Sequence, residues 1–117
     1  MAFDDLETAR AKRSVENFLD QRRPPPAIRD EIDLDYRIDV DNQSVEIHEI
    51  RPDFEDPDDE LELPVAKVTY VRSRNLWRLY WMQSDGNWHR YDPADELETL
   101  ERAWKVVDED ELGCFWG

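Results

Sequence analysis

The strict alternation of apolar and polar residues from Ile32 to Val40 is the feature that most constrains how this chain of 117 residues folds. Because successive side chains of a strand point to opposite faces, the alternation predicts a strand with one buried face and one solvent-facing face. Turn residues follow, and residues 45–50 are predicted to form the returning strand. With residues 42–43 at the tip of this hairpin, Val40 would lie opposite Val45, so that the apolar faces of both strands match.

A second group of strands is predicted further along the chain. A turn at residues 74–75 would place Val68 opposite Trp81, and the Asp-Gly turn that ends at Gly86 would place Arg90 opposite Trp81. In this register Trp88 shares the apolar face of the sheet, and the next residues of each strand lie on the other face. The expected strands span residues 65–73, 76–83 and 88–91.

Two amphipathic helices are expected to flank the strands. The first spans about residues 4–22 and ends before the Pro24–Pro26 run, because proline cannot donate the next backbone hydrogen bond. The second follows Pro93 and reaches about Val107. The predicted buried stripes are Ala11, Val15, Phe18 and Leu19 in the first helix, and Leu97, Leu100, Trp104 and Val107 in the second.

These elements predict an α+β fold in a single domain, residues 1–117. We expect an antiparallel sheet of about five strands, built from two hairpin units, with the N-terminal and the C-terminal helix packed on one face. Residues 52–63 are expected to form an acidic mobile loop, since seven carboxylates lie between Asp53 and Glu62 and like charges repel.

The net charge of −15 limits the partners of the protein. Nucleic acids and anionic membranes are polyanions and would be repelled at long range. We therefore expect no membrane association. Cys114 is the only cysteine, and the N-terminal segment lacks the basic and apolar regions of a signal peptide, so we expect a cytoplasmic protein.

Several separate motifs, in one order along nearly the whole chain, resemble a family of short bacterial proteins, the domain of unknown function DUF3024. The resemblance implies a single-domain bacterial protein with no assigned activity and no catalytic residues to transfer. The matching motifs are Arg22–Pro24, Glu49–Pro52, Asp56–Pro57, Pro64–Ser73, Trp77, Tyr80–Trp81, Trp88–Tyr91, Val107–Asp110 and Gly113–Phe115.

The candidate binding site is a face of the second strand group that combines cations with aromatic rings. Between Lys67 and Arg90 the chain has five basic residues and one acid, Asp85, which gives a local charge of +4. Such a surface suits an acidic peptide, a phosphate-bearing ligand or stacked bases. A simpler interpretation is that the arginines pair with the protein's own acidic loop or last helix. The candidate binding residues are Lys67, Arg78, Tyr80, His89 and Tyr91.

Catalytic motifs are missing from the sequence. Three glycines are too few for a glycine-rich phosphate loop, and no serine lies in a nucleophile elbow. His48 and His89 lack the spacing of metal ligands, so we assign no metal site and no cofactor. Whether the protein is an enzyme stays open, although the missing motifs favour a non-enzymatic role.

The leading hypothesis is a small binding or regulatory module that uses the basic, aromatic sheet face to bind a protein partner, whose identity the sequence does not give. The alternative is a protein that handles nucleic acid, either by binding RNA or single-stranded DNA or as a nuclease-like toxin. The net charge disfavours this alternative.

Overall fold

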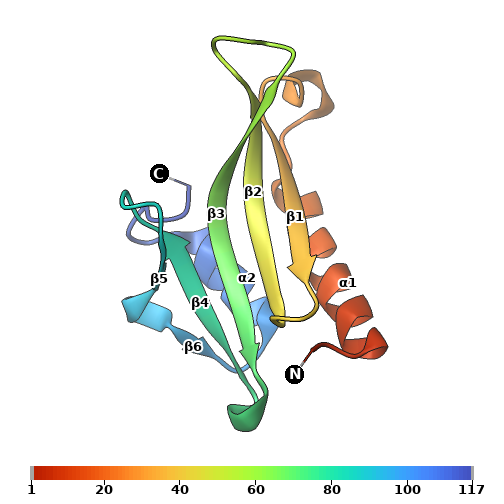
Figure 1. Cartoon of the computed structure of the whole chain (residues 1–117), viewed down its shortest axis with the longest axis vertical. Coiled ribbons are helices and arrows are strands. Elements are labelled where there is room, and N and C mark those ends of the chain that lie inside the picture. The colour runs from red at the N-terminus through yellow and green to blue at the C-terminus, as the bar shows by residue number, and fades with distance from the viewer. Residues whose placement is uncertain (1, 117) are drawn as a thin grey trace.

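A computed structural model describes residues 2–116 of the chain (Figure 1). Two α-helices enclose the strands in the sequence, and short 3-10 turns (η) lie between several elements. In chain order the elements are α1 (Asp5–Arg22), η1 (Pro26–Ile28), β1 (Asp33–Asp39), β2 (Ser44–Pro52), β3 (Glu60–Val71), η2 (Arg72–Arg74), β4 (Leu76–Met82), β5 (Trp88–Arg90), η3 (Asp92–Ala94), β6 (Glu96–Leu97) and α2 (Leu100–Glu109).

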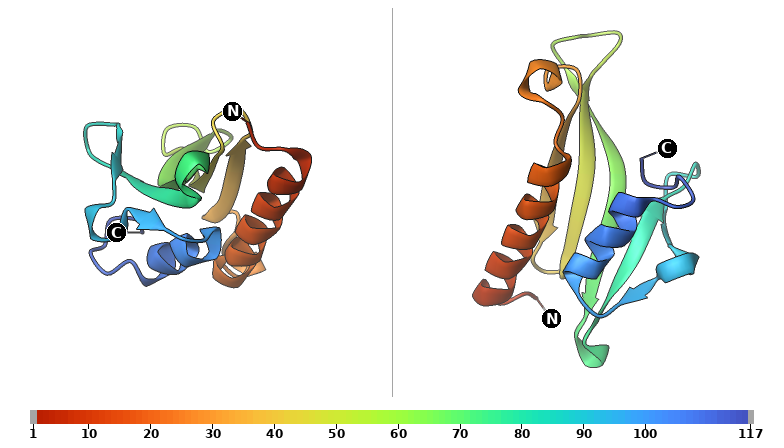
Figure 2. Two further views of the ribbon diagram at one scale, coloured as in Figure 1. Left: turned by 90° about the horizontal axis from the view of Figure 1, so that it is seen from below. Right: turned by 180° about the vertical axis from the view of Figure 1, so that it is seen from behind.

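The strands form one antiparallel sheet in the order β1-β2-β3-β4-β5, and the short β6 also pairs with β4. Both helices lie on the same face of this sheet, behind it in Figure 1 and in front of it in the right-hand view of Figure 2. The prediction of an α+β fold with both terminal helices on one face is confirmed. We call the covered face the helix side and the uncovered face the outer face.

Helix α1 begins where the sequence provides a reciprocal cap. The Asp4 carboxylate accepts from the Glu7 backbone N–H at 2.7 Å, and the Glu7 carboxylate accepts from the Asp4 N–H at 3.0 Å. These two bonds satisfy donors that have no partner within the helix. All four residues of the predicted apolar stripe are buried.

Helix α2 is shorter than predicted at its N-terminus. The structure places Pro93 in η3 and Leu97 in β6, and the helix starts only at Leu100, after the cap residue Thr99. Leu97 is nevertheless buried, because β6 pairs with β4 and turns this side chain toward the core. Apolar spacing alone did not distinguish one helix from a short strand followed by a helix.

Two hairpins keep the predicted faces but differ in register. Ile38, rather than Val40, lies opposite Val45, and Leu79, rather than Trp81, lies opposite Val68. Both turns have four residues outside the ladder instead of two, so each register shifts by two positions. A shift of two preserves the side on which every residue lies.

The β4–β5 hairpin differs by a single position, and this changes the faces. His89, not Arg90, lies opposite Trp81. The turn holds three residues, 84–86, between Gln83 and Asn87, whose backbones are hydrogen-bonded at 3.2 Å. Gly86 occupies the left-handed region with φ 79°, as the last residue of such three-residue turns requires. The odd number of turn residues exchanges the two faces of β5 relative to the prediction.

The acidic segment between β2 and β3 is shorter than the expected loop of residues 52–63. Strand β2 extends to Pro52 and β3 begins at Glu60, so residues 53–59 connect them at the far end of a long hairpin (Figure 1). Phe54 within this connection is 99 % exposed. The mobility of the segment stays a prediction.

The core lies between the helix side of the sheet and the two helices. Phe18 of α1 stacks on Trp104 of α2, with 5.5 Å between ring centroids and an interplanar angle of 5°. This stack joins the helices above the sheet. The side chains that are less than 2 % exposed and largest in volume are Leu19, Ile47, Leu79, Val15, Val45, Val68 and Val107.

Leu79 provides a test of this packing because its side chain is fully buried in β4, a strand that pairs with β3, β5 and β6. We expect Leu79→Ala to lower the free energy of unfolding by about 2–5 kcal/mol, through lost apolar burial and the cavity left behind. Leu112→Ala makes the same change at a residue that is 64 % exposed, and it should alter stability by less than about 0.5 kcal/mol. Denaturant unfolding of both variants measures the difference, and equal losses would contradict the described core.

Candidate functional site

The outer face carries a row of cations around one aromatic ring. In the sheet register Tyr80 lies between Lys67 of β3 and Arg90 of β5. The Lys67 ammonium is 5.8 Å from the centroid of the Tyr80 ring, which is within cation–π range. Met82 and Trp88 form the adjacent cross-strand pair on the same face. The result is a partly exposed surface of two cations, two aromatic rings and a thioether.

The structure brings together three of the five predicted binding residues. Lys67, Arg78 and Tyr80 share the outer face, but the placement of His89 and Tyr91 there is wrong. The shift of β5 by one position turns these two residues to the helix side. Tyr91 is 3 % exposed, with its ring centroid 4.9 Å from that of Phe115.

His89 binds within its own turn instead of joining the binding face, since its Nε2 lies 2.7 Å from the Asp85 carboxylate. Trp88 and Arg90 take the places that the sequence had assigned to His89 and Tyr91. The turn length decides which set faces outward. The Asp-Gly pair marked the turn but did not reveal its third residue.

Most of the predicted arginine cluster is neutralised within the protein. Arg74, Arg78 and Arg90 surround the Glu96 carboxylate at 2.7, 3.7 and 3.5 Å, and Arg90 also binds Asp95 at 2.8 Å. Sequence reasoning expected such partners in the acidic loop or the last helix. They lie instead in and beside β6, because this short strand returns to the edge of β4.

Another ion pair lies on the outer face, over β1 to β3. Arg37 of β1 is paired in register with Glu46, but its guanidinium reaches Glu62 of β3, which lies opposite Ile50. The ion pair therefore crosses β2 at the level of His48. His48 itself is only 8 % exposed, although no helix covers this face.

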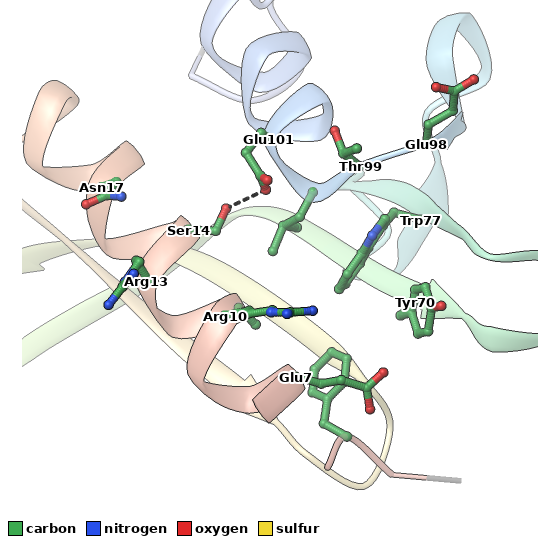
Figure 3. A pocket seen from close by; sticks show the side chains of 13 residues that line it. Glu7, Arg10, Arg13, Ser14, Asn17, Tyr70, Trp77, Glu98, Thr99 and Glu101 are labelled. Carbon is green, nitrogen blue, oxygen red and sulfur yellow. Dashed lines mark hydrogen bonds between the residues drawn. The ribbon is translucent and has the colours of Figure 1, made fainter. Parts of the chain in front are cut away.

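A cleft on the helix side was not predicted from the sequence. It has a volume of about 480 Å³ and opens between α1 and the start of α2, with β3 and β4 as its floor (Figure 3). The lining residues are Phe3, Glu7, Arg10, Ala11, Arg13, Ser14, Asn17, Tyr70, Trp77, Glu98, Thr99, Leu100 and Glu101.

The cleft exists because one face of α1 lacks large apolar side chains. Arg10, Ala11, Ser14 and Asn17 recur at helical spacing beside the apolar stripe, and the side chains at the two central positions are small. They leave Trp77 only half-buried beneath them. This mixed stripe was the one sequence signal that could have indicated the cleft.

Polar contacts fix both ends of the cleft. At one end the Arg72 guanidinium donates to both Glu7 carboxylate oxygens, at 3.0 and 2.8 Å. At the other, the Trp104 indole donates to the Ser14 hydroxyl, which donates to Glu101, each at 3.0 Å. These contacts tie α1 to the sheet at one end of the cleft and to α2 at the other.

Cys114 carries the one thiol of the sequence. Burial and the nearby Asp110 carboxylate raise the pKa of the Cys114 thiol, which disfavours the nucleophilic thiolate.

No group of three or more His, Cys, Asp or Glu side chains within residues 2–116 could hold a metal ion. No helix in this range has the length and apolar composition needed to cross a membrane.

Comparison with known proteins places the chain in a family. The model of the family described as domain of unknown function (DUF3024) matches residues 3–117. The chain belongs to the DUF3024 family. No curated protein and no solved structure matches it. For this DUF3024 protein, functional inference therefore rests on the outer face and the cleft themselves.

The Glu7–Arg72 contact at the end of the cleft should make stability depend on acidity. Hydrogen bonds from Arg72 lower the pKa of Glu7 below its ordinary value of 4.5, so the contact stabilises the fold above that pH. This stabilisation is lost as the pH falls through the lowered pKa of the folded protein. We expect Arg72→Gln to unfold more easily than wild type at neutral pH and the difference to shrink in acid.

Carboxyl carbon NMR titration checks the same contact directly. The midpoint for Glu7 should rise in Arg72→Gln and stay unchanged in Arg74→Gln, whose guanidinium binds Glu96 instead. An unchanged Glu7 midpoint in Arg72→Gln would show that the ion pair is absent in solution.

Proposed function

We propose that this DUF3024 protein is a non-enzymatic cytoplasmic module that binds a partner protein through its outer face. The observation that carries the proposal is the row Lys67–Tyr80–Arg90, with Trp88 beside it, on a sheet face that no helix covers. Tyr, Trp and Arg side chains are typical of the residues that dominate protein interfaces.

Charge supports a partner segment that carries carboxylates. Among residues 2–116 Lys67 has no ion-pair partner within 4 Å, and the Arg90 side chain is 40 % exposed. A carboxylate that approaches this row would meet one free cation and one cation that can exchange its partner. The neighbouring ion pairs on Glu96 are partly exposed and weakly stabilising, so they oppose such an exchange little.

A single cysteine cannot form a disulfide within the chain, which is compatible with a reducing cytoplasm, and we propose that location for the module. The alternative, binding of RNA or single-stranded DNA, would also use the Tyr80 and Trp88 rings. The net charge of −15 disfavours it, because the protein as a whole repels a polyanion.

Capture from a native lysate with three baits tests the proposal. The baits are wild type, Lys67→Glu/Tyr80→Ala, and Lys12→Glu as a matched charge change on exposed α1. We expect one partner protein to be retained by wild type and Lys12→Glu and lost from the double variant, which removes the free cation and its ring. Thermal unfolding of all three baits establishes that each is folded.

Two results would contradict this function. Equal retention of the partner by the double variant would place the contact elsewhere on the protein. Capture of nucleic acid alone, released between low and moderate salt, would favour the alternative, because binding to a polyanion falls steeply as salt rises.

A further inference from the structure

The cleft between α1 and α2 contains a cation that the protein itself leaves unused. Figure 3 shows the Arg10 side chain extending from α1 toward Trp77 and Tyr70, across the middle of the cleft. Among residues 2–116, no carboxylate lies within ion-pair distance of its guanidinium. A guanidinium with no acid beside it, in a protein with twice as many acidic as basic residues, is available to an external anion.

The carboxylates around the cleft are already engaged or directed away. Glu7 accepts two hydrogen bonds from Arg72, and Glu101 accepts from Ser14. The Glu98 side chain is 82 % exposed, and Figure 3 shows it pointing away from the cleft. Arg10 is therefore the charged group best placed to meet a ligand inside the cleft.

The remaining surface of the cleft is suited to a flat apolar body. Phe3, Ala11 and Leu100 are buried at its base, and the Trp77 and Tyr70 rings lie 4.9 Å apart between centroids on its floor. Its volume of about 480 Å³ falls in the range of about 300–1,000 Å³ that small-molecule sites occupy.

We propose that this cleft binds a small aromatic ligand with one negative charge, a carboxylate or a sulfonate, which pairs with Arg10 while its rings lie against Trp77 and Tyr70. A single charge is favoured because three carboxylates line the rim and would repel a multiply charged ligand such as a nucleotide. This function is separate from the outer face, which lies on the opposite side of the sheet.

Anilinonaphthalene sulfonate is a suitable probe for purified full-length protein, because it has this chemistry and becomes fluorescent on leaving water. N-phenylnaphthylamine has the same rings without the sulfonate and serves as the uncharged control. We expect one molecule of the sulfonate to bind per chain. Arg10→Glu should weaken its binding about tenfold or more, the loss expected for a charged hydrogen bond.

Three comparisons make the result specific to the cleft. Arg10→Lys should recover part of the affinity, since it keeps the charge. Lys12→Glu should bind the sulfonate as wild type does, because Lys12 lies on α1 outside the cleft. The uncharged probe should be insensitive to Arg10→Glu. These binding measurements need no partner protein. Their outcome therefore tests the cleft separately from the proposed function of the outer face.

The proposal would be overturned by any of three outcomes. The sulfonate does not bind, or binds at many weak sites, or is weakened equally by Arg10→Glu and Lys12→Glu. The last outcome would mean that the overall charge of the protein, and not the cleft, governs binding. Because Arg10 is exposed and makes no ion pair within the described chain, its variants should remain folded, which circular dichroism checks.

Discussion

Burial of one face of the sheet is the constraint on which the rest of this structure depends. Val45, Val68 and Leu79 meet in register on the helix side and are fully buried by α1 and α2. Both helices pack on the helix side, so the side chains of the outer face are stabilised by contacts with side chains of neighbouring strands. It is accordingly filled with pairs such as Ser44–Thr69, hydroxyl to hydroxyl at 2.7 Å. The same constraint leaves this face open to a partner.

On the helix side, α1 and α2 pack against the same sheet face, and they do not fill all of the space between them. The Phe18–Trp104 stack brings α1 and α2 together at one level. Toward the N-terminus of α1, the small side chains of Ala11 and Ser14 cannot extend that contact over Trp77. The cleft is therefore a consequence of where along α1 the large apolar residues stop, and hydrogen bonds that join α1 to Arg72 and to α2 lie at its two ends.

Periodicity explains which parts of the fold could be predicted. The helical stripe that includes Val15 identified the buried face of α1 correctly. The alternation from Ile32 to Val40 identified the buried face of β1 correctly, because the register error of two residues in this hairpin does not change a face. The faces of β5 depended on whether the turn before it held an even or an odd number of residues, and Gly86 fits either case. Contacts such as those of Glu96 with three arginines depend on chain segments that meet only in the folded sheet, so no local pattern indicates them.

Under the two proposals, Lys67 and Arg10 would allow an acidic protein to recognise an anion. The net charge of −15 acts over long range, but at physiological salt it is screened over about 8 Å. Within that distance, binding of an anion depends on whether the nearest cation already has an ion-pair partner, and most arginines of the sheet already pair with a carboxylate of the protein. Lys67 and Arg10 do not, within the described residues, and each is directed toward an aromatic ring on a different side of the sheet. A ligand at either place would have to fit closely to one cation and its ring, an arrangement that suits a single, well-placed negative charge better than an extended polyanion.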